Sequence, residues 1–495
     1  MNQQSRVESS LRYVGKSVPR VDALDKVTGQ ALYPGDLTRP DMLHLKILFA
    51  GRPHARIVGL DTSRALAMPG VVAVLTARDV PVNEYGLALN DQPALCDEVI
   101  RFEGDQIAVV VAESEKTAAQ ARDLIEVAYE DLPVVSDPRD AQQPDSILVH
   151  ADRSSNVLKH YRIRKGDVDE GFAQADVIVS GRYYLPMQEH AYLQPEAGLA
   201  YMDGDQVVVE TAGQWAHHDQ RQIAHALGLP LERVRIIYRA IGGAFGGRED
   251  ISVQIALALA AWKTGRPVKI VWNREESIRG HCKRHQMYIT ARWGATREGR
   301  LTAAEVEVIA DAGAYAYTST MVLGQVNLTC TGVYDIPNVK VDSYAVYTNN
   351  IPGGAFRGFG SPQGIFAAEI QMDRLAEKLG LDPVTIRERN LLREGSLLSV
   401  DTPLPPGIDL GRMLDACARA AGWSCVNGEW SRPEPAPASS PTRKRGVGLA
   451  IGFKNVGFGF GYPEDASVTI ELHGEAEIDE AIVCYAGAEC GQGTH

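Results

Sequence analysis

The segment RAIGGAFGGRED, residues 239–250, places four glycines among six consecutive residues around a single phenylalanine, Phe245. It follows a predicted strand, residues 232–239, and precedes an alanine-rich apolar stretch, residues 251–265, that predicts a buried helix. Three explanations compete for this loop: a phosphate-binding loop, a tight strand-to-helix turn, and a close approach of the backbone to a large ligand. The glycine spacing fits neither G-x-G-x-x-G nor G-x-x-x-x-G-K-[ST], and the acidic pair Glu249-Asp250 would repel a phosphate.

Two other segments share the character of this loop. GGAFRGFGSPQG, residues 353–364, and GAECGQGTH, residues 487–495, combine several glycines with phenylalanine, arginine or glutamine. Four glycines around one phenylalanine exceed what a simple turn needs. Three such loops together favour the third explanation, an extended polar ligand held by backbone amides and a few long polar side chains.

Charge and cysteine content exclude several classes of function. The net charge of −13 argues against binding to nucleic acid or to an anionic membrane surface, because both need a basic face. No window of about 18 apolar residues occurs, so no membrane span is predicted. The seven cysteines include no C-x-x-C pair, so no zinc or iron–sulfur site is evident, and they predict reduced thiols in a cytoplasmic protein.

The chain of 495 residues is too long for one core, and its pattern predicts a mixed α/β (α+β) fold with several units. The predicted divisions are an N-terminal extension, a small α/β unit, a larger mixed unit, a connector with a Pro-rich linker, and a short, incomplete last unit: 1–20, 21–150, 151–400, 401–446 and 447–495.

Several elements carry local patterns. In the small unit, ARIVGLD and GVVAVLTA predict strands, and Ser114 is the predicted N-cap of a helix. A long helix with Pro362 in its first turn and Gly380 at its end is predicted in the larger unit. Three strands are predicted in the last unit: GVGLAIGFKN, ASVTIELHG and EAIVCYAGAE.

Four motifs in this order carry a family resemblance: GGAFGGRED, AFRGFGSPQG, LGLDPVTIRERNLL and the terminal GQGT. The chain resembles the molybdenum-binding subunit of the xanthine dehydrogenase/aldehyde oxidase family of molybdo-hydroxylases, most like the bacterial xanthine dehydrogenases. The resemblance implies that residues 21–150 form an α/β hammerhead domain and 151–400 a first molybdopterin-binding domain. It implies that 447–495 begin a second such domain, which either a separate chain or further sequence completes.

The resemblance also assigns cofactor-binding residues. Gln214, Phe245 and Arg357 match positions near the molybdenum, without being direct ligands of the metal. The full set of matched cofactor residues is Gln214, Gly243, Phe245, Gly246, Arg357 and Gln492. From the residues alone, Gln214 could be a strand-end side chain facing water and Arg357 a salt-bridge partner. His495 has no readable role.

Three residues match substrate-binding positions. Glu249 matches an acidic residue that holds the purine ring in xanthine-type members, Phe359 an aromatic that stacks on it, and Gln325 an arginine of animal-type enzymes. A carboxyl group can accept an N–H or share a proton with a ring nitrogen. The alternatives are a helix-dipole charge for Glu249 and core packing for Phe359. A neutral amide at Gln325 cannot stabilise developing negative charge as arginine does, which favours N-heteroaromatics generally over xanthine itself.

The implied function is the oxidation of purines, such as xanthine and hypoxanthine, or of related N-heteroaromatics, with water as the oxygen source. Two alternatives stay open: an aldehyde oxidoreductase subunit, and a non-catalytic scaffold half of a split or truncated subunit. The implied cofactor is molybdenum–molybdopterin, with the cytosine dinucleotide form open.

Partners follow from what the sequence lacks. No catalytic residue is assigned within this chain, because the expected base, a glutamate in a GE-type loop, has no match in residues 1–495. Partner subunits are expected to carry iron–sulfur clusters and FAD. The missing half-domain is expected either from a separate chain or from further sequence, and without these parts the chain is expected to be inactive.

Overall fold

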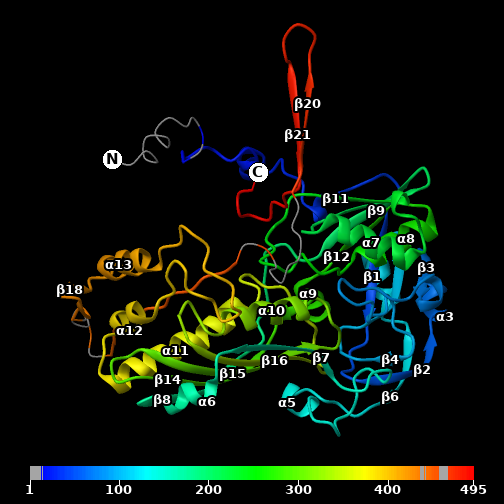
Figure 1. Cartoon of the computed structure of the whole chain (residues 1–495). Coiled ribbons are helices and arrows are strands. Elements are labelled where there is room, and N and C mark those ends of the chain that lie inside the picture. Colours follow the sequence, from blue (N-terminus) through cyan, green and yellow to red (C-terminus); the bar gives the residue numbers. More distant parts are fainter. Residues whose placement is uncertain are drawn as a thin grey trace.

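The computed structural model describes residues 13, 15–434, 440, 442–455, 457 and 466–494 (Figure 1). His495, most of the predicted N-terminal extension and part of the Pro-rich linker lie outside the described residues. Within the described part, no helix is both long and apolar enough to cross a membrane. The architecture is mixed α/β, as the sequence predicts.

A seven-stranded sheet joins the N-terminal unit to the first part of the larger unit. Its strands, in spatial order, are β11 (Val234–Tyr238), β10 (Gln206–Thr211), β9 (Ala197–Asp203), β12 (Val268–Val271), β1 (Leu43–Phe49), β5 (Gln106–Ala112) and β3 (Val71–Thr76). The link is the parallel pair β1–β12, in which Leu43 lies opposite Val268. Strands from both sides of residue 150 therefore share one sheet.

Helices on this sheet bury its apolar side chains. α7 (Ala216–Leu227) packs on β11, and the alanine-rich α8 (Gln254–Thr264) packs on β9 and β10. α8 is buried along eight of its eleven residues, which confirms the prediction of a buried helix. α4 (Glu115–Arg122) packs on β1 and β5, and the Ser114 hydroxyl accepts a hydrogen bond from the Thr117 amide at 3.1 Å, as its N-cap role predicts.

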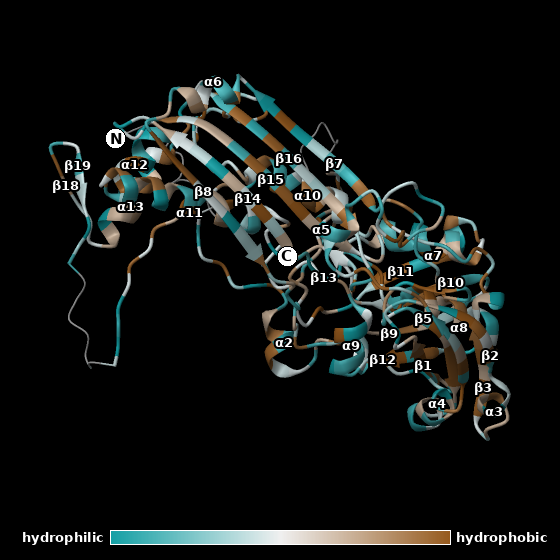
Figure 2. Ribbon diagram, turned by 90° about the horizontal axis from the view of Figure 1, so that it is seen from below, coloured by the Kyte–Doolittle hydropathy of each residue, from teal (hydrophilic) through white to brown (hydrophobic). Residues whose placement is uncertain are grey.

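A five-stranded sheet forms the core of the rest of the larger unit. Its strands, in order, are β7 (Val157–Lys165), β16 (Asn338–Tyr347), β15 (Leu301–Gly313), β14 (Met287–Ala295) and β8 (Val177–Leu185). Figure 2 shows hydrophobic and hydrophilic residues alternating along these strands. α10 (Ser319–Thr329) and α11 (Ser361–Leu379) cover one face, where α11 packs on β8 and β14 and α10 on β16 and β7. α11 has Pro362 in its first turn and ends at Gly380, both as predicted.

The remaining elements are short. The small sheets are β4 (Val99–Ile100), β2 (Ala55–Asp61) and β6 (Glu126–Asp131); β13 (Lys283–Arg284) and β17 (Gly353–Gly354); and β18 (Ser424–Val426) and β19 (Glu429–Ser431). The other helices are α2 (Ala23–Thr28), α3 (Ser63–Leu66), α5 (Pro138–Ala141), α6 (Val168–Ala173), α9 (Arg274–Gly280), α12 (Pro383–Asn390) and α13 (Leu410–Ala420).

The segment GVGLAIGFKN, residues 446–455, is not a strand, so that prediction is wrong. Its apolar side chains at Leu449 and Ile451 instead pack against the core of the five-stranded sheet. The Ile451 amide donates to Glu369 of α11 at 2.9 Å, and the Leu449 carbonyl accepts from Arg387 of α12 at 3.2 Å. Side chains of two helices therefore satisfy backbone groups that a strand would have paired with another strand.

The last described segment is a lone hairpin of β20 (Val468–His473) and β21 (Glu480–Tyr485), which projects from the body of the molecule (Figure 1). Every residue in both strands is exposed. The cross-strand register places six apolar residues on one face: Val468, Ile470, Leu472, Ala481, Val483 and Tyr485. The two strands predicted here are confirmed, and the chain continues from β21 into the third glycine-rich loop.

Candidate active site

The first glycine-rich loop joins β11 to α8 and lies directly against the second. Gly243 and Gly246 have left-handed φ angles of 103° and 97°, and Phe245 has a φ of 52°. A Cβ atom at Gly246 would lie 2.9 Å from the Cα of Phe356, and the Arg357 amide donates to the Phe245 carbonyl at 2.7 Å. The bare backbone at Gly246 is therefore needed for contact with another loop of the same chain.

The second glycine-rich loop begins in β17 and leads into α11. The parallel pair β13–β17 fixes its start, and a Cβ atom at Gly354 would lie 2.4 Å from the Cys282 sulfur. The Arg357 side chain is exposed at the surface of this loop. Phe359, with a φ of 52°, packs against the core of the five-stranded sheet, which is the alternative that the sequence left open for it.

The third glycine-rich loop, residues 487–494, lies beside the first. Cys490 packs against Ala212, Ile241 and Ala244, at the end of β10 and within the first loop. Burial raises the pKa of the Cys490 thiol, and the neighbouring Glu489 and then Glu249 add to the effect. The Gln492 side chain folds back on its own loop, donating to the Ala488 carbonyl at 2.6 Å and accepting from the Cys490 amide at 2.7 Å.

Gln214 and Glu249 meet where the first loop faces the end of β10. The Gln214 amide nitrogen Nε2 lies 3.4 Å from Glu249 Oε1, and the Gln214 backbone N–H donates to the Arg248 carbonyl at 2.9 Å. Burial, with a further contribution from Asp250, raises the pKa of Glu249 to about 8, while Lys454 opposes the shift. Because α8 begins at Gln254, Glu249 lies outside its first turn and is not a helix-dipole charge.

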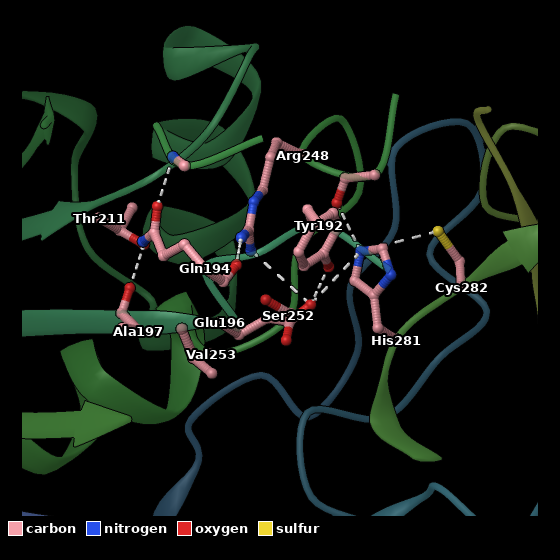
Figure 3. A network of polar contacts seen from close by, with 12 residues as sticks. Tyr192, Gln194, Glu196, Ala197, Thr211, Arg248, Ser252, Val253, His281 and Cys282 are labelled. Carbon is pink, nitrogen blue, oxygen red and sulfur yellow. Dashed lines mark hydrogen bonds and ion pairs between the residues drawn. The ribbon is translucent and has the colours of Figure 1, made fainter. Parts of the chain in front are cut away.

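A buried polar network supports the segment between Gly247 and Glu249 (Figure 3). Arg248 lies over the Tyr192 ring, 3.9 Å from its centroid, and donates to the Gln194 carbonyl at 2.6 Å. Glu196, which is fully buried, accepts from the Tyr192 hydroxyl and lies 3.7 Å from Arg248. Arg248 is thus held by an aromatic face, a carbonyl and a carboxylate at once.

His281 completes the network from the other side. Burial and nearby cations hold the pKa of His281 well below its usual value, so the ring is neutral. Its Nε2 lies 2.5 Å from the Gly247 carbonyl and therefore donates to it. Nothing in the sequence marks Tyr192, Glu196 and His281 as partners of the loop, since they come from two distant segments without a recognisable motif.

Gln325 lies within α10 and is buried. Its backbone carbonyl accepts from the Thr329 hydroxyl at 2.7 Å. One turn earlier, the Val322 carbonyl would lie 2.5 Å from a Cβ atom at Gly360 of the second loop. α10 therefore abuts the second loop, with Gln325 inside the helix packing.

These residues fit a large polar ligand that carries anionic or oxo groups. Gln214 Oε1 is buried and has no hydrogen-bond partner among the described residues, so it can accept a hydrogen bond from a ligand. The exposed Arg357 guanidinium offers a fork of donors, and Phe245 is 45% exposed beside it. The closely packed glycine-rich backbones leave little side-chain bulk between these groups.

Comparison with known proteins gives two family matches. Residues 149–391 match the molybdopterin cofactor-binding domain, and residues 28–133 match the a/b hammerhead domain of aldehyde oxidase and xanthine dehydrogenase. The chain is 40% identical over 410 residues to the nicotinate dehydrogenase large molybdopterin subunit of Eubacterium barkeri, an alignment that covers 82% of this chain and 96% of that subunit.

Other relatives are longer. A probable xanthine dehydrogenase subunit of Bacillus subtilis is 40% identical over 403 residues, which cover 81% of this chain and 54% of that protein. Among solved structures, the aldehyde oxidoreductase from Desulfovibrio gigas has a TM-score of 0.80 and 34% identity, over 82% of this chain and 46% of that one. The chain thus spans nearly the whole of the first relative and about half the length of the other two.

Proposed function

Because the chain belongs to the molybdenum-binding subunits of the xanthine dehydrogenase/aldehyde oxidase family, we propose that it forms one wall of the active site of an N-heteroaromatic hydroxylase. Purines are the proposed substrates, with nicotinate-like rings as the nearest variant. The single observation that supports this choice is Glu249, a partly buried carboxyl group with a pKa of about 8 at the meeting point of the loops. A carboxyl group that is protonated near neutral pH can donate to a ring nitrogen, and an aldehyde substrate offers none.

The cofactor would lie against the three glycine-rich loops. Gln214 and Arg357 would hydrogen-bond it through the amide and the guanidinium, and the backbones of Gly243, Phe245 and Gly246 would lie beside it. Gln492 would contact the pterin from the third loop. When bound, the molybdenum cofactor supplies the two-electron oxidation and the activation of water.

Within this wall, the chain's own residues bind and orient the substrate. Glu249 would hold a ring nitrogen, and Arg248, through its buried network, would keep Glu249 from turning away. Phe359, in the second loop, and Gln325, in α10 behind that loop, remain proposed substrate neighbours. We assign the catalytic base and the electron carriers to other parts of the complex, namely the rest of the molybdopterin domain and the iron–sulfur and FAD-binding subunits.

The test is turnover by the complex that co-purifies with this chain. Xanthine, hypoxanthine, nicotinate and benzaldehyde are assayed in parallel, with an artificial electron acceptor. Oxidation of at least one heteroaromatic, well above the benzaldehyde rate, is the expected outcome. Fast benzaldehyde oxidation with inert heteroaromatics would support the second candidate, an aldehyde oxidoreductase, which the similarity to the Desulfovibrio gigas enzyme favours.

A loaded complex that turns over none of the four compounds would support the scaffold alternative. The control is the same preparation from cells that lack molybdate, in which every rate should disappear.

A further inference from the structure

The third glycine-rich loop is folded around one carboxylate, Glu489. The Glu489 side chain is only 3% exposed. It accepts hydrogen bonds from the amides of Gly491 at 2.7 Å, of Gly493 at 3.2 Å and of Thr494. Three backbone donors converging on one carboxylate give the loop its curvature, because they fix the residues on both sides of Gln492.

A residue from the other end of the chain holds this carboxylate. Arg20 Nη2 lies 3.1 Å from Glu489 Oε1, and its Nη1 lies 3.4 Å from the Gly491 carbonyl. Arg20 is itself fixed by Asp22, which accepts from its Nε and Nη2 at 2.9 Å each. The guanidinium therefore neutralises the buried carboxylate and touches the loop backbone as well.

Without these contacts the loop would have many conformations. Gly491 and Gly493 have φ angles of 112° and 84°, in the left-handed region that glycine enters freely. A loop that must be ordered at the moment of binding lowers affinity, whereas one ordered in advance does not. Cys490 lies between these contacts and packs on the first loop. By fixing the third loop, Glu489 therefore also fixes its contact with the candidate active site.

We propose that Glu489, held by Arg20, is a positioning residue that preorganises the third loop, and with it Gln492, for the molybdenum cofactor. This inference rests on the proposed function. Glu489 acts through the loop backbone and not by contact with the cofactor, so its removal should lower cofactor retention while the folded body of the molecule stays intact.

The experiment compares molybdenum per chain in complexes purified through a tag on this chain. The variants are Glu489→Gln, Glu489→Asp and Arg20→Ala. The matched control is Glu471→Gln, an exposed glutamate on the face of the hairpin opposite its six apolar residues. Glu489→Gln should lower the molybdenum content about tenfold, as loss of a supporting hydrogen-bond partner does in metal sites. Glu489→Asp should recover part of the content, and Arg20→Ala should have a smaller effect, because a partly exposed ion pair contributes less.

Two further readouts separate positioning from folding. Hydrogen exchange at the amides of residues 491–494 should be faster in Glu489→Gln, while the thermal midpoint of the chain stays at the wild-type value. Wild-type molybdenum content in Glu489→Gln, or a loss matched by a lower midpoint, would overturn the inference. A wild-type complex without molybdenum would contradict the proposed function itself, and this inference with it.

Discussion

Glu249 and Asp250 are adjacent carboxyl groups in different surroundings, Glu249 partly buried and Asp250 buried. Glu249 reaches Gln214 at the candidate site, whereas Asp250 lies 3.5 Å from both the Ala355 amide and the Cys282 sulfur between the first two loops. Burial is the main cause that raises the pKa of Glu249 to about 8 and that of Asp250 to about 7. Glu249 is therefore mostly protonated near neutral pH.

This raised pKa has a cost in stability with a definite pH dependence. Glu249 has a pKa of about 4.5 when unfolded and about 8 when folded, so the folded state holds the extra proton between these values. Stability is therefore lost as the pH rises from about 4.5 to 8 and changes no further above 8. Glu249→Gln should be more stable than wild type at pH 8.5 by up to a few kcal/mol, since one pKa unit corresponds to about 1.4 kcal/mol.

Thermal midpoints at pH 5 and pH 8.5 test this prediction. The gain should be small at pH 5 and larger at pH 8.5. Glu232→Gln, at an exposed position, is the control and should show no difference between the two pH values. A gain in Glu249→Gln that is equal at both pH values would contradict the assignment of a raised pKa.

The same substitution should have the opposite effect on activity. Glu249→Gln is expected to lower turnover of heteroaromatic substrates by about 10²–10⁴-fold, the usual contribution of a positioned acid or base. Any benzaldehyde turnover should stay within about threefold of wild type, since that substrate has no ring nitrogen for Glu249 to hold.

The pH profile gives an independent check on Glu249. If the protonated carboxyl binds the ring, kcat/KM for the wild-type complex should fall as the pH rises above about 8. Undiminished heteroaromatic turnover in Glu249→Gln would rule out the substrate role.

At the scale of elements, the side chain of Arg387 fixes the position of α12 against its neighbours. Arg387 is fully buried and donates from Nε to Glu369 of α11 at 2.9 Å, while a second nitrogen lies 2.9 Å from Asp373. Glu369 also accepts from the Tyr334 hydroxyl and from the Ile451 amide. One arginine of the LGLDPVTIRERNLL motif thus joins α12, α11 and the irregular segment 446–455.

Removing this arginine should destabilise the chain strongly. Arg387→Ala leaves the Glu369 carboxylate buried without its cation, which typically costs about 3–5 kcal/mol. Arg419→Ala, which breaks an exposed ion pair with Asp415, is the matched control and should change stability by less than about 0.5 kcal/mol. Denaturant unfolding of both variants measures the difference, and equal midpoints would show that the buried ion pair contributes nothing.

Elements with a complete local pattern could be predicted from the sequence, and others could not. Ser114 and Gly380 mark helix ends because a cap depends on neighbouring residues only. The apolar pattern of segment 446–455 predicts a strand, but its partners, Glu369 and Arg387, lie far away in the chain. The two-residue strands β13 and β17 are too short to carry any pattern.

Some residues of the candidate site could be predicted from the sequence, and others could not. The glycine-rich loops and Gln214 could be identified by resemblance, and the structure brings them together. The network of Tyr192, Glu196 and His281 behind the first loop could not be identified, because ordinary residues from distant segments form it.

At the scale of the whole molecule, the sheet shared by the two units could not be predicted from the sequence either. No local pattern shows that β1 pairs with β12 across residue 150.

The exposed hairpin should govern how the purified chain behaves in solution. Its six-residue apolar face has no covering layer within the described residues, and an isolated two-stranded hairpin is marginally stable in water. A chain purified without partners should therefore self-associate through this face. The double variant Ile470→Thr/Val483→Thr replaces an ethyl and a methyl group with hydroxyls. It should raise the dissociation constant at least about tenfold, because each lost carbon contributes about 0.8 kcal/mol and about 1.4 kcal/mol is a factor of ten.

Sedimentation velocity over a range of concentrations measures this association. Ile482→Thr makes the same chemical change as Ile470→Thr, but on the opposite face of the hairpin, and serves as the control for that single substitution. Association that is weakened equally by the control would show that the apolar face is not the contact surface.

The ion pair between Arg20 and Glu489 also sets an order of events during biosynthesis. The two residues are 469 positions apart in the sequence. The third loop therefore cannot be fixed until Glu489, synthesised 469 residues after Arg20, has left the ribosome. At about 5–20 residues per second, this delay is roughly 25–100 s after the N-terminal strands begin to emerge. Of the three glycine-rich loops, the third is therefore the last whose contacts can form, so a cofactor that requires the ordered loop can bind only after Glu489 has been synthesised.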